Sequence, residues 1–141
     1  MGLATAQLLA SRGAIICLAD LNEKSLETAL ASLKGSEKHM SEVVDVRSPE
    51  SINAWIGNVV KRFDKIDGAV NMAGVITPAV PITEQKVEDW DLVFAVNARG
   101  VFNCLKAQLG AMAPGGSIVS RFKVACAGYD VSRKNSFEVH D

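Results

Sequence analysis

Short apolar runs alternate with amphipathic stretches along most of the chain. Continuous apolar runs at 14–19 and 66–72 are typical of strands buried on both faces of a sheet, and a weaker run at 40–46 predicts another strand. From 52 to 63, apolar residues recur at spacings of three and four, which places them on one face of a helix. A further strand begins at 117–120. This alternation predicts crossover connections and an α/β fold with a mostly parallel sheet.

Residues with strong positional preferences mark the ends of the predicted helices. Asn22 is placed to cap one helix, and Ser48 followed by Pro49 is a typical start of another. A long helical region is predicted over 84–112, with a break near 97–100. The sequence Pro114-Gly115-Gly116 is expected to end that region before the last strand.

The two ends of the chain differ from its regular middle. Residues 2–12 predict a helix of the kind that normally follows a strand, and residues 121–141 carry scattered charges without clear periodicity. We therefore expect one domain over 1–120 and a divergent tail over 121–141.

Composition narrows the class of protein. The chain has 141 residues, of which 48% are apolar, and its 15 Lys and Arg nearly balance 16 Asp and Glu, so a nucleic-acid partner is not expected. No apolar run reaches the ~18 residues of a membrane span. Three widely spaced cysteines form no metal-binding pattern, and they fit reduced thiols in a cytoplasmic protein. His39 and His140 have no partner pattern and are expected to be solvated loop residues.

Two carboxylates follow predicted strands. Ligands of parallel sheets bind at the carboxyl ends of the strands. Asp20 ends the first apolar run, 18 residues after Gly2, close to the ~20-residue offset between a glycine turn and an acid that binds a ribose hydroxyl. The same carboxylate could instead interact with the start of the next helix. Asp45 follows the second strand and fits equally well as a turn residue.

Two asparagines are further candidates. Asn71 ends the third strand and could brace neighbouring strands, and the small residues Ala73 and Gly74 would let a ligand approach the backbone. The same segment could be a simple turn. Asn97 interrupts an apolar helical stretch, which suggests a bend or a site, although a solvent-facing side chain is the alternative.

Together these segments resemble the short-chain dehydrogenase/reductase family over about residues 1–120. The matching segments are Gly2-Leu3-Ala4-Thr5-Ala6, Ala19-Asp20-Leu21, Asp45-Val46, Asn71-Met72-Ala73-Gly74, Asn97-Ala98-Arg99-Gly100 and Gly115-Gly116-Ser117-Ile118-Val119. The resemblance implies a Rossmann-like, doubly wound parallel sheet that binds NAD(H) or NADP(H). It also implies hydride transfer between the nicotinamide and an alcohol or ketone.

The resemblance assigns cofactor-binding roles to individual residues. The residues expected to bind the cofactor are Gly2, Asp20, Leu21, Asp45, Val46, Asn71, Ala73 and Gly74. Asp20 would bind the adenosine ribose hydroxyls, and because its carboxylate repels a 2′-phosphate, NAD is favoured over NADP. Asp45 and Val46 would contact adenine. No metal is implied.

Several parts of the family pattern have no match. Gly2 corresponds to the last glycine of the family's TGxxxGxG turn, and the strand before that turn, the other glycines and the C-terminal third are missing. By analogy with the usual strand order, the missing strand would lie between the strands at 14–19 and 66–72. We therefore expect an incomplete sheet with two unpaired strand edges.

The catalytic residues match only in part. Asn97 corresponds to the family asparagine that supports the active-site lysine through water, and Tyr129 to the catalytic tyrosine. However, Lys123 falls where the family has serine, and Arg133 where it has the lysine of YxxxK. Tyr129 is therefore either the catalytic tyrosine or an incidental residue of an altered tail.

Three hypotheses follow for the function. The chain is an NAD-dependent oxidoreductase, a truncated product of such a gene with little activity, or a non-catalytic binding or interaction module on a Rossmann-like scaffold. We expect weak NAD binding and very slow or no turnover of an alcohol or ketone. A homo-oligomer is possible, because relatives commonly pair through the helix that corresponds to 101–112.

Overall fold

The computed structural model describes residues 1–78, 80–121, 127–129 and 137–139. Its helices are α1 (Gly2–Ser11), α2 (Glu23–Ala31), α3 (Pro49–Phe63), α4 (Val87–Phe94) and α5 (Val101–Ala111). Short 3-10 helices lie at Ser36–Lys38 and Ile82–Glu84, and a π-helix at Ala95–Gly100 joins α4 to α5. The strands are β1 (Cys17–Asp20), β2 (Met40–Val43), β3 (Ile66–Asn71), β4 (Met112–Ser120), β5 (Ala127–Tyr129) and β6 (Phe137–Val139).

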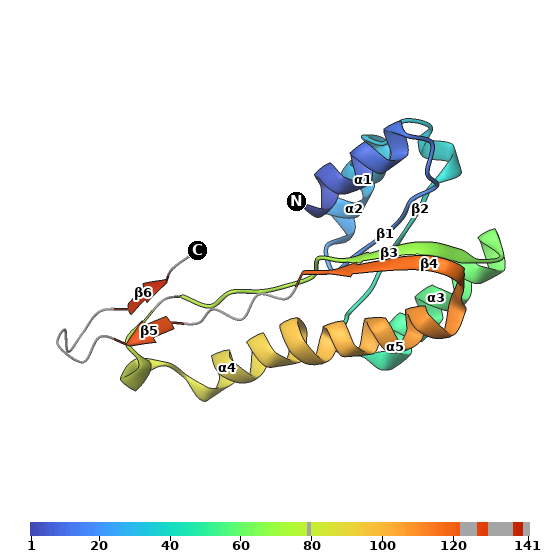
Figure 1. The fold of residues 1–141 in the computed structure, drawn as a ribbon. Coiled ribbons are helices and arrows are strands. Elements are labelled where there is room, and N and C mark those ends of the chain that lie inside the picture. The colour runs from blue at the N-terminus through green and yellow to red at the C-terminus, as the bar shows by residue number, and fades with distance from the viewer. Residues whose placement is uncertain (79, 122–126, 130–136, 140–141) are drawn as a thin grey trace.

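The described strands form three separate pairs. β1 pairs with β2 and β3 pairs with β4, both in parallel, whereas β5 and β6 are antiparallel. Helices α1 and α2 lie on one side of these strands, and α3 and α5 lie on the other (Figure 1). The predicted α/β fold with parallel strands is therefore confirmed.

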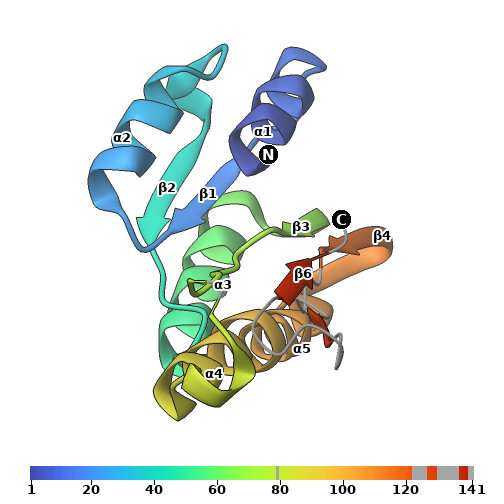
Figure 2. The same ribbon diagram turned by 90° about the vertical axis from the view of Figure 1, so that its left-hand side faces the viewer.

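The parallel strands do not form one continuous sheet. β1 and β3 are neighbours in the fold (Figure 2), yet among the described residues no strand pairs with the second edge of either one. This is the position that the sequence predicts for the missing strand. The expectation of an incomplete sheet with two unpaired edges is confirmed.

The capping residues act as predicted. The Asn22 side chain accepts a hydrogen bond from the Ser25 N–H at 2.9 Å, and the Ser48 hydroxyl accepts one from the Ser51 N–H at 3.1 Å. Pro49 occupies the first turn of α3, where its missing N–H costs no hydrogen bond. Each such cap stabilises its helix by about 1 kcal/mol.

Two groups of buried residues hold the helices against the strands. The larger core joins α3, α5 and the strands, and its centre is the fully buried Ile52. Its other buried members are Val44, Ile56, Val59, Ile66 and Cys104. A smaller core joins α1 to β1 and consists of Ala6, Ala10 and Leu33, with Ile16 and Leu18 packed against them. The two cores therefore lie on opposite sides of the interrupted sheet.

Four predicted boundaries differ from the structure. The first strand begins at Cys17 rather than 14, and the second ends at Val43 rather than 46. The expected helix over 84–112 begins only at Val87, and its expected break is a π-helix. β4 begins at Met112, so Pro114-Gly115-Gly116 lies within the strand, where the register with β3 shifts and Gly115 takes a positive φ of 83°. Local sequence did not reveal this bulge, because it depends on pairing with β3.

The part of the chain that the structure describes has no helix that combines the length and apolar character needed to cross a membrane.

Candidate functional site

The carboxyl end of β1 presents Asp20 to solvent. Its Oδ1 accepts a hydrogen bond from the Asn22 N–H at 3.0 Å, in the turn that leads into α2. The carboxylate therefore organises the helix start, as the alternative interpretation expected, and remains exposed to a ligand. The adjoining Leu21 is also exposed.

The carboxyl end of β2 lies beside the end of β1. The Val44 N–H donates to the Asp20 carbonyl at 3.0 Å, which brings the segment before Asp45 alongside Asp20. The Arg47 side chain donates to both oxygens of the Asp45 carboxylate, from Nε at 2.9 and 3.0 Å and from Nη2 to Oδ2 at 2.6 Å, and the Arg47 N–H also donates to Oδ1 at 2.9 Å. This side-chain hydrogen bonding lowers the pKa of Asp45 and raises that of Arg47. The geometry supports the interpretation of Asp45 as a turn residue.

Val46 faces the helical stretch opposite. A Cβ placed on Gly100 would lie 2.8 Å from the Val46 Cγ2, so only glycine fits this contact without a shift. The Val46 carbonyl also accepts a hydrogen bond from the Asn103 Nδ2 at 3.2 Å. Val46 thus connects the loop after β2 to the helix, and its contact with adenine stays a prediction.

Asn71 braces the end of β3 from inside the protein. Its Nδ2 donates to the Gln108 Oε1 at 2.9 Å and to the Ser120 hydroxyl at 3.1 Å, while the Gln108 Nε2 donates back to the Asn71 Oδ1 at 2.8 Å. These bonds link β3 to both β4 and α5, so the predicted bracing role is confirmed. Gln108 was not predicted from the sequence; it lies one helical turn after Cys104, on the same buried face of α5.

Asn97 fixes the loop that follows β3. Its Oδ1 accepts the Val75 N–H at 2.8 Å, and its Nδ2 donates to the Val75 carbonyl at 2.9 Å. Asn97 is buried in the π-helix, so the alternative of a solvent-facing side chain is wrong. A Cβ on Gly74 would lie 3.4 Å from the Asn97 Oδ1, whereas Ala73 and Gly74 are exposed on their other side.

The first turn of α1 lies beside the end of β3. A Cβ on Gly2 would be 3.7 Å from the Met72 Cβ. The structure thus brings the Gly2 turn next to the segment that contains Ala73 and Gly74 (Figure 2). These residues, with Asp20 and Asp45 at the ends of β1 and β2, form the candidate site at the carboxyl ends of the strands.

Of the expected catalytic positions other than Asn97, the structure describes only the backbone of Tyr129. Tyr129 lies on β5, opposite Phe137 of β6, and its side chain is outside the part that the structure describes. Lys123 and Arg133 also lie outside the described residues. The catalytic assignment of Tyr129 therefore stays a prediction.

The expectation for His39 is wrong. The side chain is buried, its Nδ1 accepts the Ile16 N–H at 3.1 Å, and its Nε2 lies 3.1 Å from the Lys34 carbonyl oxygen. It fixes the chain where β1 begins and is too enclosed to act at the site. His140 lies outside the described residues.

Comparison with known proteins identifies the family. A family model described as enoyl-(acyl carrier protein) reductase matches residues 1–131. The short-chain dehydrogenase/reductase aba4 of Botryotinia fuckeliana is 44% identical over 126 residues, which cover 85% of this chain and 48% of the relative. The protein ABA4 of Pyricularia oryzae, described in the same words, is 40% identical over 125 residues, or 85% of this chain and 46% of the relative. This chain belongs to the short-chain dehydrogenase/reductase family.

Solved structures of the family agree with this assignment. The structure of NAD⁺-bound xylitol dehydrogenase matches with a TM-score of 0.79 and 37% identity, over 84% of this chain and 47% of that one. Levodione reductase matches with a TM-score of 0.79 and 31% identity, over 84% of this chain and 48% of that one. The chain thus spans about half the length of the relatives it matches, and its fold is an incomplete Rossmann fold.

Short-chain dehydrogenases/reductases use NAD or NADP, and the site can be compared with the needs of these cofactors. A ribose diol needs an exposed hydrogen-bond acceptor at a strand end, which Asp20 provides. Neither of the two ion pairs found within the described residues involves Asp20, so its charge is not neutralised by those pairs. The exposed Asp20 carboxylate therefore fits the hydrogen-bonding needs of a ribose diol.

Proposed function

We propose that this chain is the cofactor-binding part of an NAD-dependent short-chain oxidoreductase that acts on an alcohol or ketone. The bound dinucleotide supplies the hydride acceptor or donor of that chemistry. The observation that carries the proposal is the exposed carboxylate of Asp20 at the end of β1, in a member of this family. Residues 1–120 form the cofactor domain in this proposal, and 121–141 form a divergent tail.

The electrostatics of this site support NAD over NADP. The Asp20 carboxylate accepts hydrogen bonds from ribose hydroxyls and repels a 2′-phosphate. Arg47, in the loop after the adjacent strand β2, is the nearest following arginine in the sequence, and its guanidinium is bound to Asp45. A 2′-phosphate at Asp20 would thus meet a negative charge.

The remaining site residues act on the cofactor in different ways. In this proposal the adenine site is lined by Leu21, Asp45 and Val46. The exposed Ala73 and Gly74 let the dinucleotide approach the backbone. Gly2 places the first turn of α1 beside that segment. Asn71 contributes from the interior by fixing the end of β3.

The catalytic residues lead us to expect a very low rate. Asn97 positions the loop after β3 through Val75, and Tyr129 would hold or accept the proton of the substrate hydroxyl. The residues at the family's serine and lysine positions are Lys123 and Arg133, and a planar guanidinium does not replace a compact ammonium. We therefore propose weak NAD binding with very slow or no turnover, in the cytoplasm.

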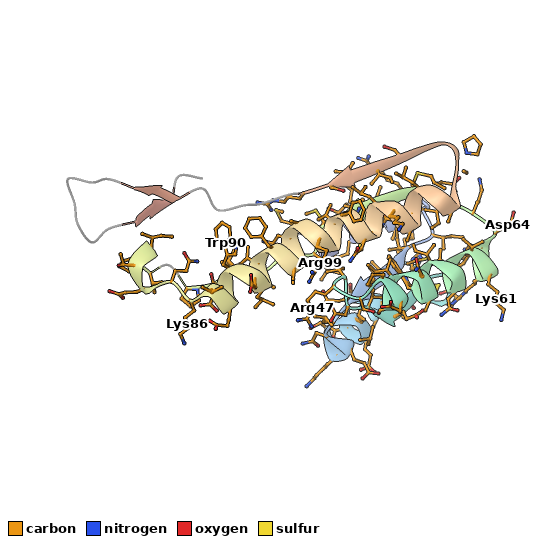
Figure 3. The ribbon with its side chains drawn as sticks, turned by 90° about the horizontal axis from the view of Figure 1, so that it is seen from below. Arg47, Lys61, Asp64, Lys86, Trp90 and Arg99 are labelled. Atoms are coloured by element: carbon orange, nitrogen blue, oxygen red, sulfur yellow. The ribbon has the colours of Figure 1, made fainter. Side chains whose placement is uncertain are left out.

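The surface of α4 and α5 supports a homo-oligomer. Phe102 and Leu109 are exposed on α5, and Trp90 stacks on Phe94 with ring centres 4.4 Å apart. Figure 3 shows Trp90 on the part of the helix that extends beyond α3. An adjacent hollow is lined by Asp91, Phe94, Ala95, Ala98 and Arg99. Light scattering of the purified chain, with Phe102→Asp compared with Lys106→Asp, tests whether this face joins two copies.

Calorimetric titration with NADH and NADPH tests the cofactor proposal. NADH should bind more tightly than NADPH, with an affinity weaker than micromolar. Asp20→Asn should weaken NADH binding about tenfold, because it replaces a charge-assisted hydrogen bond by a neutral one, and should reduce the discrimination against NADPH. The matched control is Asp67→Asn, near the amino end of β3.

Either of two results would contradict the proposal. NADH affinity that Asp20→Asn leaves unchanged would show that the carboxylate does not bind the ribose. Micromolar NADH affinity in the unaltered chain would contradict the expectation of weak binding. Oxidation of NADH in the presence of ketones measures turnover separately.

A further inference from the structure

The loop after β2 is attached to the helix opposite through Val46. The Asn103 Nδ2, in the first turn of α5, donates a hydrogen bond to the Val46 carbonyl at 3.2 Å. The Val46 side chain lies so close to Gly100 that a Cβ there would be 2.8 Å from the Val46 Cγ2. Figure 3 shows Arg47 and Arg99 at the place where this loop meets the helix. The helix therefore holds both the backbone and the side chain of Val46.

The residue before Val46 is held from another side. The Asp45 N–H donates to the Ser51 hydroxyl of α3 at 3.1 Å, and the Asp45 carbonyl accepts the Ser48 N–H at 3.0 Å. Asp45 and Val46 are the two residues expected at the adenine. The position of this loop therefore depends on α5 as well as on α3, the helix into which it leads.

The same helical segment holds the loop after β3. Within the π-helix, the buried Asn97 accepts the Val75 N–H at 2.8 Å and donates to the Val75 carbonyl at 2.9 Å. Val75 directly follows the exposed Gly74. Asn97, Gly100 and Asn103 follow one another at intervals of three residues, so about two turns of helix anchor both loops.

The winding of this segment links the two anchors. A π turn is a rare winding that occurs mostly as a single turn inside an α-helix, frequently at functional sites. Here it contains Asn97 and ends at Gly100, the residue against which Val46 packs. A shift of this turn towards α-helical winding would rotate Asn97 relative to Gly100, so the two loops would not both keep their contacts.

We propose that Asn103 is a positioning residue of the cofactor site, and that the π-helix couples the loop after β2 to the loop after β3. Asn103 holds Val46 in place, Val46 keeps the π turn through Gly100, and Asn97 in that turn holds the second loop. A dinucleotide that reaches both loops binds in proportion to the fraction of chains in which both are in place. The inference rests on the proposed binding of NAD, whereas the coupling can be measured without the cofactor.

Asn103→Asp tests the hydrogen bond to the loop. The substitution keeps the size of the side chain but replaces the donor by an acceptor, which would face the Val46 carbonyl. NADH binding to the full chain, followed by nuclear magnetic resonance, should weaken about tenfold. Asn53→Asp makes the same chemical change on the exposed side of α3, and it should leave NADH binding unchanged.

Asn103→Ala separates the hydrogen bond from the added charge. It removes the donor without a new carboxylate, so NADH binding should weaken in the same direction as in Asn103→Asp. Circular dichroism compares the folding of the variants with that of the unaltered chain. If Asn103→Asp does not fold, Asn103→Ala gives the same measurements.

Hydrogen exchange tests the coupling in the absence of NADH. The Val75 amide, whose acceptor is the Asn97 Oδ1, should exchange about tenfold faster in both Asn103 variants than in the unaltered chain. The amide of the buried Ile56 in α3 should keep its rate, because the variants loosen one segment and not the whole fold. A purely local role of Asn103 at Val46 would leave the Val75 amide unchanged.

The outcomes distinguish this inference from the proposed function. If the unaltered chain does not bind NADH, the proposed function fails and the inference fails with it. If NADH binds equally to the unaltered chain and to the Asn103 variants, only the inference fails. Unchanged exchange at Val75, or equal acceleration at Val75 and Ile56, would also overturn it.

Discussion

Asn71 and Gln108 exchange two side-chain hydrogen bonds, at 2.9 and 2.8 Å, although they lie 37 residues apart in the chain. Both side chains are buried, and only 2% of the Gln108 surface is exposed. An amide pair of this kind satisfies the donors and acceptors of both residues at once. It therefore fixes the distance between α5 and the end of β3, on which the candidate site depends.

Removal of one amide of this pair should be costly. Gln108→Leu leaves the Asn71 Oδ1 without its glutamine donor, and we expect a loss of about 1–3 kcal/mol in the free energy of unfolding, measured with urea. Gln7→Leu, on the exposed side of α1, is the control and should change stability by less than about 0.5 kcal/mol. Equal effects of the two substitutions would show that the buried pair contributes nothing beyond surface contacts.

Gly100 should tolerate no side chain while Val46 is present. Gly100→Ala places a Cβ against the Val46 Cγ2, and we expect destabilisation by about 1–3 kcal/mol. Val46→Ala in the same chain should recover part of this loss. Gly110→Ala is the matched control, because its Cβ would meet nothing within 4 Å and should stabilise α5 by up to about 1 kcal/mol. Thermal unfolding measures all three, and a stable Gly100→Ala single variant would contradict the contact.

The ion pair of Asp45 and Arg47 should contribute to stability in a defined pH range. Hydrogen bonds from Arg47 lower the folded-state pKa of Asp45 below its ordinary value of 3.8. The contribution is therefore complete above about pH 5, and it is lost as the pH falls through the lowered pKa. Because solvent screens the exposed Arg47 side chain, we expect this contribution to be small.

Asp45→Asn should remove this contribution. The difference in urea midpoint between the variant and the unaltered chain should be largest near neutral pH and should vanish in acid. High salt should reduce the difference at neutral pH, because an exposed pair is screened. A difference that grows as the pH falls would have the wrong sign for this pair.

Cys17 should react slowly with alkylating reagents. Burial raises the pKa of its thiol to about 11, against a smaller opposing effect of the Arg62 charge. At about pH 8 the thiolate fraction is then roughly a hundredfold lower than for a thiol with the ordinary pKa of 9.0. Mass spectrometry of the iodoacetamide-treated chain should show little modification of Cys17 until urea unfolds it. Modification at the rate of free glutathione would contradict this prediction.

The sequence predicted those features of the fold that depend on neighbouring residues. Asn22 and Ser48 cap their helices through bonds to residues three positions later, so the signal lies within one turn of chain. The position of the interrupted sheet and the family were also predicted, because the motifs that carry them keep their order along the chain.

Features that join distant segments could not be predicted in the same way. The buried hydrogen bonds of Gln108 and His39 were not predicted, because their partners, Asn71 and Ile16, lie 37 and 23 residues away in the chain. The π-helix was expected only as a break, and its Asn97 bonds to Val75, 22 residues earlier in the chain. These three cases depend on tertiary contacts that no local pattern contains.

The π-helix at Ala95–Gly100 constrains the number of residues in the continuous helical segment that it forms with α4 and α5. A π turn holds one residue more than an α turn, so the residues before it are rotated by about 100° relative to an unbroken α-helix. Deletion of a single residue there would restore regular winding, but it would also swing the Trp90 and Phe94 rings round the axis and withdraw the Asn97 amide from Val75. The number of residues between α4 and α5 is therefore as much a constraint as their chemical identity.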